Sequence, residues 1–378
     1  MNKLRLAIVR QQYRLDGGAE RFISRTLQAL RNEKINFNII TRKWKNTNLY
    51  PLLNLHICNP IKLGRLSREY GFACAARKCW EREKFDIVQS HERIAGCDIF
   101  RAGDGVHRVW LEERARISRT SWKQFNTYLS PYHHYVLQAE KHLFNAPSLK
   151  AVICNSNMVK KNILRFFSLN AEKIHVIYNP IDSEKFQPAM EITRYRSRQI
   201  LNLPLNSTVM IYVGSGFERK GLKVAIEAIS NSDRYLIIVG QDKNFSFYQQ
   251  LANQLHCLAR LRFVGIQQDV RPFYHAADAL LLPTFYDPFP NVVLEAMACG
   301  LAIITSTNCG GAELINIGQE GFVCNTFDIK SLNEAILATP SRTDNSTMGD
   351  AARQKIQFLT PERFAKLLSS LYQKVINV

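Results

Sequence analysis

One stretch of the sequence places two adjacent cations beside a glycine turn. Val213-Gly-Ser-Gly-Phe-Glu-Arg-Lys-Gly221 contains Gly214, Arg219 and Lys220 directly after a predicted strand. A guanidinium and an ammonium group at such a place neutralise a diphosphate, whose negative charge grows as a bond to it breaks. The spacing fits neither a Walker A loop nor G-x-G-x-x-G. A solvated turn with two surface cations is the competing interpretation, and the residues alone favour neither.

Two carboxylates stand eight residues apart in Asp287-Pro-Phe-Pro-Asn-Val-Val-Leu-Glu-Ala-Met-Ala-Cys-Gly300. A loop carries Asp287, and a helix predicted to begin near Asn291 carries Glu295, so both can face the carboxyl end of a sheet, where α/β folds bind ligands. There they accept hydrogen bonds from sugar hydroxyls, while the helix N-terminus favours phosphate. Capping by the aspartate and an exposed glutamate is the alternative, but an acid in the apolar run 292–298 usually has a partner or a function.

Gly17 and Gly18 lie in Asp16-Gly-Gly-Ala-Glu20, between the first predicted strand and a helical pattern. Two glycines let the backbone pass close to a ligand, and the unpaired N–H groups of the following helix attract an anion. An ordinary turn between a strand and a helix has the same sequence character. The pair is therefore a candidate ligand contact that the sequence alone does not decide.

Short β-rich runs alternate with helical patterns along the whole chain, and they must position these candidate sites. Continuous apolar strands separated by helices are typical of a parallel sheet that is covered on both faces. The sequence therefore predicts an α/β protein with two doubly wound Rossmann-like domains. The predicted strands are residues 6–9, 37–40, 86–88 and 151–154 in the first half, and 209–213, 235–239, 261–264, 279–282 and 302–305 in the second.

A proline turn and a polar segment mark the boundary between the two domains. Val176-Ile-Tyr-Asn-Pro-Ile-Asp182 ends a strand, and a charge-rich segment follows it. We therefore predict one domain over residues 1–182 and a second over 183–359. Apolar residues recur at helical spacing in the last segment, about 360–378, which predicts an amphipathic helix packed on a core.

Length and charge narrow the class of protein. The chain of 378 residues is long enough for two domains, and 46% hydrophobic and 22% charged residues exclude a disordered or fibrous protein. The formal net charge is +18, but residues 1–180 hold 31 basic and 14 acidic side chains, a net charge of +17. A field of this sign attracts nucleic acid, anionic lipid or a phosphorylated substrate, and charge alone does not choose among them.

The cysteines and the N-terminus favour a cytosolic protein. The nine cysteines are scattered without C-x-x-C spacing, so neither a disulfide framework nor a zinc knuckle is indicated. The first apolar run ends at Arg10, which makes it too short for a signal peptide. No run approaches the length that spans a bilayer, so we expect any contact with a membrane to be at its surface.

These stretches together identify the chain as a member of glycosyltransferase family 4. The resemblance extends over essentially the whole length of the chain. Within that family the chain is similar to bacterial lipopolysaccharide core glucosyltransferases. The resemblance implies the GT-B fold, in which two Rossmann-like domains face a central cleft and the C-terminal helix returns to the N-terminal domain. It implies that the first domain binds the acceptor and the second the nucleotide-sugar. The resemblance depends on residues 17–18, 173–182, 186, 214–221, 263–265, 274–278, 281–283 and 287–300.

Family members transfer a sugar from a nucleotide donor with retention of configuration, and neither a cofactor nor a metal is expected. By resemblance, Arg219 and Lys220 hold the donor diphosphate and Glu295 holds the ribose hydroxyls. The paired acids of the family are usually both glutamate, so Asp287 is a departure that weakens its assignment to the hydroxyls of the donor sugar. The remaining donor contacts implied are Gly17, Gly18, Gly214, Phe289, Pro290, Asn291 and Val292, where Pro290 replaces a residue that is often small.

Two positions of the first domain resemble residues near the acceptor. His91 ends Ile87-Val-Gln-Ser-His91, which is similar to a strand whose following histidine or polar residue approaches the transferred sugar in relatives. Asp104, between two glycines, resembles an acidic position near the acceptor in the core glucosyltransferases. The resemblance gives both residues a catalytic and acceptor-binding role. The alternative for His91 is a structural histidine whose hydrogen bonds are made within a loop. The alternative for Asp104 is an ordinary glycine turn.

Residues 106–125 mix cations with aromatic side chains, which suits the headgroup zone of an anionic membrane. Core packing of the aromatic side chains, with solvated cations, is the competing interpretation. Because the basic excess lies in the half that binds acceptor by resemblance, we favour a peripheral enzyme on the cytoplasmic face of the bacterial inner membrane. The residues concerned are Trp110, Arg114, Arg116, Arg119, Trp122, Lys123 and Phe125.

The resulting hypothesis is a hexosyltransferase that moves glucose from UDP-glucose to the phosphorylated heptose region of a lipid-anchored core oligosaccharide. Its expected partners are a nucleotide-sugar, a phosphorylated glycolipid and an anionic membrane surface, and nucleic acid is not expected. Two alternatives stay open. A nucleotide-sugar epimerase of the GT-B fold would turn over the donor without any acceptor. A basic nucleic-acid-binding protein would explain the charge, although no helix-turn-helix, zinc-finger or RNA-recognition signature appears.

Overall fold

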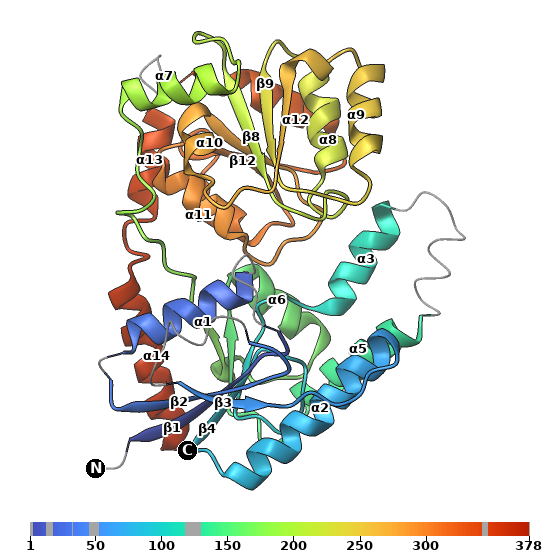
Figure 1. Cartoon of the computed structure of the whole chain (residues 1–378), viewed down its shortest axis with the longest axis vertical. Coiled ribbons are helices and arrows are strands. Elements are labelled where there is room, and N and C mark those ends of the chain that lie inside the picture. The colour runs from blue at the N-terminus through green and yellow to red at the C-terminus, as the bar shows by residue number, and fades with distance from the viewer. Residues whose placement is uncertain are drawn as a thin grey trace. The chain divides into compact units, whose positions relative to one another are not determined.

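The computed structural model describes residues 3–12, 18–31, 33–44, 53–117, 130–341 and 347–377, and the chain divides into two compact units (Figure 1). The first unit consists of Met1–Pro180 and Pro361–Val378, and the second of Ile181–Thr360. These limits lie within two residues of the boundaries expected from the sequence. Both units are α/β, and each is built on one parallel sheet, as predicted.

The first unit contains a seven-stranded sheet in the order β3-β2-β1-β4-β5-β6-β7, with every neighbouring pair parallel. Its order reverses between β1 and β4, which are paired at Leu6 and Ile87. Ligands of open α/β sheets bind at such a reversal, beyond the carboxyl ends of the strands. The strands are β1 (Leu4–Val9), β2 (Ile35–Thr41), β3 (Asn54–Ile57), β4 (Ile87–Ser90), β5 (Ile99–Arg101), β6 (Ala151–Cys154) and β7 (Ile174–Val176).

Helices cover both faces of this first sheet. Figure 1 shows α1 and α14 on one side of the sheet and α2 and α5 on the other. α2 packs on β2 and on α5, and α5 also contacts α3. The helices of this unit are α1 (Gly18–Ala29), α2 (Gly64–Glu83), α3 (His107–Ile117), α5 (Pro131–Phe144), α6 (Asn157–Phe166), the short η2 (Ala171–Lys173) and α14 (Pro361–Ile376).

The C-terminal helix α14 completes the core of the first unit. Its apolar face joins a cluster that includes Leu6 and Ile8 of β1 and Phe22 of α1. Phe22 and Phe364 meet edge to face, with ring centroids 5.2 Å apart. The amphipathic helix expected at the end of the chain, and its return to the N-terminal domain, are therefore confirmed. Its buried side chains are Phe364, Leu368, Leu371, Tyr372 and Val375.

The second unit contains a six-stranded parallel sheet in the order β10-β9-β8-β11-β12-β13, which reverses between β8 and β11. Its strands are β8 (Val209–Val213), β9 (Tyr235–Val239), β10 (Leu261–Gly265), β11 (Ala279–Leu282), β12 (Ala302–Ser306) and β13 (Gly321–Cys324). Its helices are α7 (Glu191–Ile200), α8 (Leu222–Ser230), α9 (Phe245–Gln254), η3 (Leu258–Arg260), α10 (Arg271–Ala276), α11 (Asn291–Ala298), η4 (Gly310–Leu314), α12 (Ile329–Ala338) and α13 (Thr347–Lys355).

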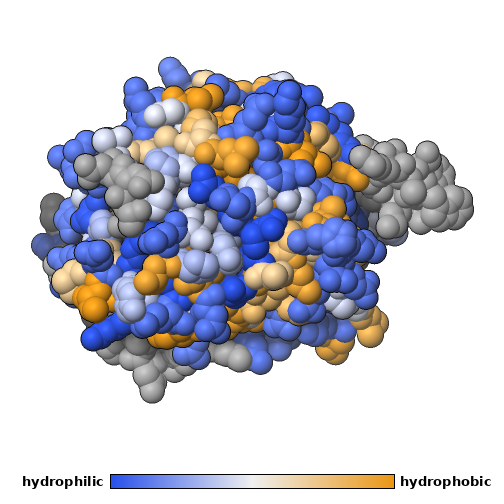
Figure 2. All heavy atoms as spheres, turned by 90° about the horizontal axis from the view of Figure 1, so that it is seen from above, coloured by the Kyte–Doolittle hydropathy of each residue, from blue (hydrophilic) through white to orange (hydrophobic). Residues whose placement is uncertain are grey.

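The described surface is mainly hydrophilic. On the face shown in Figure 2, hydrophobic residues form small patches between hydrophilic ones. All nine cysteines are free thiols, and most of them are buried. Among the helices of the described ranges, none has the length and the apolar character needed to cross a bilayer.

Candidate active site

The loop after β8 places Lys220 at the carboxyl end of the second sheet. Gly214, the first residue of this loop, has a φ of +153°, and a Cβ there would overlap the aliphatic part of the Lys220 side chain. Gly221 has a φ of +74°, and a Cβ there would overlap the carbonyl oxygen of Pro283 at the end of β11. Both glycines are therefore needed for close packing. Because Lys220 is buried, the alternative of two solvated surface cations is wrong for this residue.

Asp287 lies between the two cations of this loop. Its Oδ2 atom is 3.3 Å from Nη1 of Arg219 and 3.3 Å from Nζ of Lys220. Arg219 also donates from Nη1 to the carbonyl oxygen of Tyr286 at 2.8 Å. The carbonyl of Asp287 accepts a hydrogen bond from the N–H of Gly310 at 2.8 Å, which fixes the loop. The structure thus brings Arg219, Lys220 and Asp287 together at the reversal of strand order.

Glu295 belongs to α11 and is only 1% exposed, which contradicts the alternative of an exposed glutamate. Its Oε2 atom accepts a hydrogen bond from the hydroxyl of Tyr274 at 3.1 Å. The sequence did not indicate this partner, since Tyr274 comes 21 residues earlier in another helix. The hydrogen bond holds the carboxylate in one orientation.

The start of α11 follows the loop that carries Asp287. Pro290 occupies the N-cap position, and Asn291 and Val292 are the first helical residues, which places the helix where the sequence predicted it. Phe289 and Asn291 are buried, and Val292 is half-buried. The N-terminal end of a helix attracts an anion, and in α11 the N–H of Val293 already donates to the carbonyl of Pro290 at 3.1 Å. The donor contacts assigned to 289–292 remain predictions.

His91 follows β4 and ends a buried chain of hydrogen bonds. The hydroxyl of Tyr372 donates to Oε1 of Gln89 at 2.9 Å, and Nε2 of Gln89 donates to Nε2 of His91 at 3.0 Å. Since Nε2 accepts, the proton of a neutral ring lies on Nδ1, a buried atom without a hydrogen-bond partner in the described part of the chain. Burial, followed by the nearby cations Arg101 and Arg10, lowers the pKa of His91 well below its usual value. His91 is therefore a neutral N–H donor.

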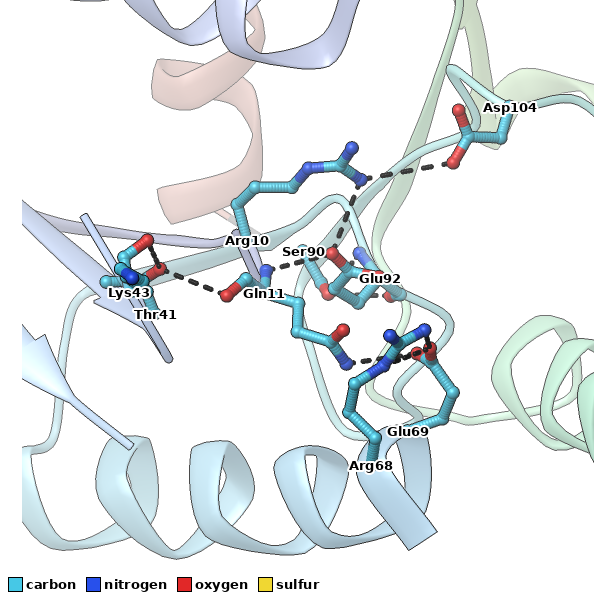
Figure 3. Close-up of polar contacts among 9 residues, drawn as sticks. All are labelled: Arg10, Gln11, Thr41, Lys43, Arg68, Glu69, Ser90, Glu92 and Asp104. Carbon is cyan, nitrogen blue, oxygen red and sulfur yellow. Dashed lines mark hydrogen bonds and ion pairs between the residues drawn. The ribbon is translucent and has the colours of Figure 1, made fainter. Parts of the chain in front are cut away.

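Arg10 connects Asp104 with Glu92 at the carboxyl end of the first sheet (Figure 3). Its Nη1 atom lies 3.3 Å from Oε1 of Glu92 and 3.9 Å from Oδ2 of Asp104. Oε1 of Glu92 also accepts a hydrogen bond from the N–H of Gln11 at 2.9 Å, and the Gln11 amide donates to Glu69 at 3.0 Å. The side chain of Asp104 is 60% exposed. These carboxylates can accept hydrogen bonds from sugar hydroxyls.

A cavity of about 40 Å³ adjoins this network of Arg10, Glu92 and Glu69. Burial raises the pKa of Glu92, although Arg10 opposes this effect. Arg93, which also lines the cavity, donates from Nε to the buried Glu140 at 2.7 Å. The network was not predicted, because its members are far apart in the sequence. Further residues that line the cavity are Phe72, Ala73, Ile94, Tyr132, Tyr135, Val136 and Ala139.

Two sets of predicted residues lie partly outside the described ranges. Gly18 is the first residue of α1, as expected for the end of a strand-to-helix turn, whereas Gly17 lies outside those ranges. Residues 107–117 of the expected membrane segment form α3, in which Val109 and Leu111 are buried and Trp110 is half-buried. The other predicted residues of that segment, Arg119, Trp122, Lys123 and Phe125, also lie outside the described ranges.

His107 should make the stability of the first unit depend on pH. Burial, followed by the Arg93 guanidinium, lowers its pKa from 6.5 to about 3. Below pH 6.5 the unfolded chain therefore binds a proton at this residue that the folded chain does not bind. The free energy of unfolding consequently decreases as the pH is lowered. Between pH 7 and pH 5 the loss should be about 2 kcal/mol. His107→Gln should remove this part of the pH dependence.

Urea unfolding followed by tryptophan fluorescence measures this effect, because all four tryptophans lie between Trp44 and Trp122 and report on the first unit. The wild type and the variant should be compared at both pH values. Equal losses of stability in the two proteins would show that His107 is not the group responsible.

Two parallel-sheet Rossmann-like units, with the last helix returned to the first, are the architecture of the GT-B glycosyltransferases. The solved structure of WaaG, a glycosyltransferase involved in lipopolysaccharide biosynthesis, matches with a TM-score of 0.81 over 96% of this chain and 99% of that chain, at 22% identity. Sucrose-phosphate synthase from Thermosynechococcus elongatus matches with a TM-score of 0.79 over 99% of both chains, at 19% identity. These likenesses agree with the fold predicted from the sequence.

Family models cover nearly the whole chain. The model described as Glycosyltransferase Family 4 matches residues 16–185, and that described as Glycosyl transferases group 1 matches residues 193–354. The chain belongs to glycosyltransferase family 4 and is an enzyme that transfers a sugar.

Relatives of known activity extend along most of the chain. UDP-Gal:alpha-D-GlcNAc-diphosphoundecaprenol alpha-1,3-galactosyltransferase of Escherichia coli is 25% identical over 100% of this chain and 98% of its own length. Lipopolysaccharide glucosyltransferase WaaG of Escherichia coli K12 is 23% identical over 85% of both chains.

Proposed function

We propose that this enzyme is a retaining hexosyltransferase that moves glucose from UDP-glucose to the heptose region of a lipid-linked lipopolysaccharide core. The cluster of Arg219, Lys220 and Asp287 carries the proposal, because it concentrates positive charge where an α/β sheet binds ligands. The names of the two Escherichia coli relatives, which refer to a diphosphoundecaprenol acceptor and to lipopolysaccharide, support a lipid-linked acceptor. A GT-B neighbour from Anabaena, solved with UDP and glucose, supports the donor class.

The proposed donor site uses the charges of the second unit. Arg219 and Lys220 bind the diphosphate and stabilise the negative charge that grows on it as the bond to the sugar breaks. Asp287, which pairs with both cations, exchanges them for sugar hydroxyls when the diphosphate binds. Glu295 accepts hydrogen bonds from the ribose hydroxyls, in the orientation set by Tyr274. The cations supply the positive charge that the leaving group needs, so the proposed reaction uses no metal.

The proposed reaction has no protein nucleophile. The acceptor hydroxyl attacks the anomeric carbon from the face that the diphosphate leaves, so the configuration is retained. Its oxygen forms the new glycosidic bond, and its proton passes to the leaving phosphate. Catalysis then depends on positioning and electrostatics. His91 donates from Nδ1 to the transferred sugar, and Asp104 accepts a hydrogen bond from the acceptor.

The proposed location is the cytoplasmic face of the bacterial inner membrane, where the enzyme binds peripherally. The net charge of +17 on residues 1–180 supports it, because anionic headgroups and a phosphorylated glycolipid both attract a basic surface.

A comparison of donors with and without acceptor tests this proposal. UDP-glucose, UDP-galactose and GDP-mannose are incubated with the enzyme alone or with heptose-terminated lipopolysaccharide. We expect rapid release of UDP from UDP-glucose only when the acceptor is present, and a product with an α-linkage by NMR. Fast donor turnover without acceptor, or a β-linked product, would overturn the proposal.

A further inference from the structure

An apolar tip stands at the beginning of α2. Ile61 is 92% exposed and Leu63 87%, more than any other large hydrophobic residue described. Leu66 and Tyr70, both exposed, follow one helical turn apart and therefore lie on one face of α2. Lys62 and Arg65 are exposed between them. We call these six residues the α2 entry surface.

Buried polar contacts hold this surface in place. Arg42, which is buried at the end of β2, donates from Nη2 to Oδ1 of Asn59 at 2.9 Å and to the carbonyl of Pro60 at 2.8 Å. Its Nη1 atom donates to the carbonyl of Arg68 in α2 at 3.2 Å. The N–H of Leu63 donates to Oγ of Ser67 at 2.7 Å. Hydrogen bonds therefore hold both ends of the loop from which the Ile61 and Leu63 side chains project into solvent.

The charge around the tip is positive. Residues 61–70 contain three cations and one acid, Glu69, whose carboxylate already accepts hydrogen bonds from Arg68 and Gln11. The Arg65 guanidinium lies over the ring of Tyr132, 3.6 Å from its centroid. Aliphatic residues that project between cations and aromatic rings are typical of segments that insert into the headgroup zone of an anionic bilayer.

Other elements of the first unit extend this surface. Tyr132 and His133 begin α5, and His133 lies 3.4 Å from Arg114 of α3. In Figure 1, α2, α3 and α5 occupy the same side of the first unit. The apolar residues Val109 and Leu111 of α3 are buried, so the described part of the segment expected to meet the membrane lacks exposed aliphatic side chains of its own. The α2 entry surface supplies them.

We propose that the α2 entry surface inserts into an anionic lipid bilayer and so anchors the first unit. This inference rests on the proposed function, because a lipid-linked acceptor requires the enzyme to work at a membrane. A projecting tip suits a bilayer better than a folded protein partner, which would need a complementary hollow. The cations would contact lipid phosphates while Ile61 and Leu63 enter the acyl boundary.

Vesicle flotation tests the inference with matched variants. The double variant Ile61→Ser/Leu63→Ser should bind vesicles of phosphatidylcholine and phosphatidylglycerol roughly tenfold or more weakly than the wild type, because two aliphatic side chains no longer leave water. The control Ile200→Ser/Ile317→Ser changes residues of the second unit that are 81% and 69% exposed and should bind as the wild type does. Lys62→Gln/Arg65→Gln should weaken binding only when phosphatidylglycerol is present.

A fluorophore on Cys74 provides an independent measurement. Cys74 is the one exposed cysteine and lies one turn after Tyr70 on α2. The emission of an environment-sensitive label should shift to the blue when anionic vesicles are added to the wild type, and it should shift less in Ile61→Ser/Leu63→Ser.

Three results would overturn the inference. They are equal binding of the double variant and its control, equal binding of the wild type to neutral and anionic vesicles, and a dimer by sedimentation that Ile61→Ser/Leu63→Ser dissociates. Turnover of UDP-glucose with a water-soluble heptoside distinguishes this failure from failure of the proposed function. The double variant should keep that turnover, whereas an enzyme that binds vesicles but never releases UDP would refute only the catalytic proposal.

Discussion

Replacement of Lys220 by alanine should lower the turnover number of sugar transfer about 10²–10³-fold, the range found when one preorganised electrostatic group is removed from an active site. Lys220 is buried beside Gly214, and its ammonium group lies 3.3 Å from Asp287. In the proposed reaction this charge faces the diphosphate when its bond to the sugar breaks. Arg219, the second cation, remains in the variant, so the loss should be large but incomplete.

The matched control for this variant is Lys223→Ala. Lys223 lies one turn further along, in α8, and pairs with Glu227 on the surface of the same helix. Steady-state rates of UDP release should fall in Lys220→Ala and stay near the wild-type value in Lys223→Ala. Circular dichroism establishes that both variants are folded. Normal turnover in a folded Lys220→Ala enzyme would remove Lys220 from the mechanism.

Replacement of Asp278 by asparagine should destabilise the second unit by about 3–5 kcal/mol, because it leaves two buried guanidinium groups without a compensating charge. Oδ1 of Asp278 accepts a hydrogen bond from Arg194 at 2.6 Å, and Oδ2 accepts one from Arg198 at 2.8 Å. Oδ2 also accepts the N–H of Val209, at the start of β8, at 2.7 Å. This carboxylate therefore joins α7 to the centre of the second sheet.

Hydrogen exchange at the amides of β8 measures this effect within the second unit, which contains no tryptophan. Asp233→Asn is the control, because Asp233 is an exposed residue that pairs with Arg234 on the surface. Surface pairs contribute little to stability. Protection of β8 should fall steeply in Asp278→Asn and hardly change in Asp233→Asn. A similar change in both variants would mean that the buried ion pairs do not stabilise the fold.

The central strands could be predicted from the sequence because they are continuous apolar runs buried on both faces. The bounds of β6, β8, β9 and β11 agree with the prediction at both ends. Strands β3, β5 and β13 were not predicted. β3 is an edge strand whose residues are exposed or half-buried, and β5 contains only three residues, so neither produces a continuous apolar run.

The candidate site was only partly predictable, because motifs locate residues and not their partners. The glycine loop and the acidic stretch led to Arg219, Lys220 and Asp287, and the structure brings the three together. The ion pairs of Asp287 with Arg219 and Lys220 were not expected. Likewise, the hydrogen bond from Tyr372 to Gln89 joins residues 283 positions apart, and only tertiary structure creates it. A short sequence motif does not predict contacts between residues that are far apart in the chain.

The return of α14 to the first unit reverses the order in which the two units are completed on the ribosome. Domains generally fold as they emerge, beginning from the N-terminus. Here residues 181–360 are all made before the first unit receives the five core side chains of α14. One face of the first sheet, which α1 covers only in part, must therefore wait for the rest of its cover until α14 has been made. During this interval the nascent chain should be a substrate for chaperones, even though most of its first unit was synthesised early.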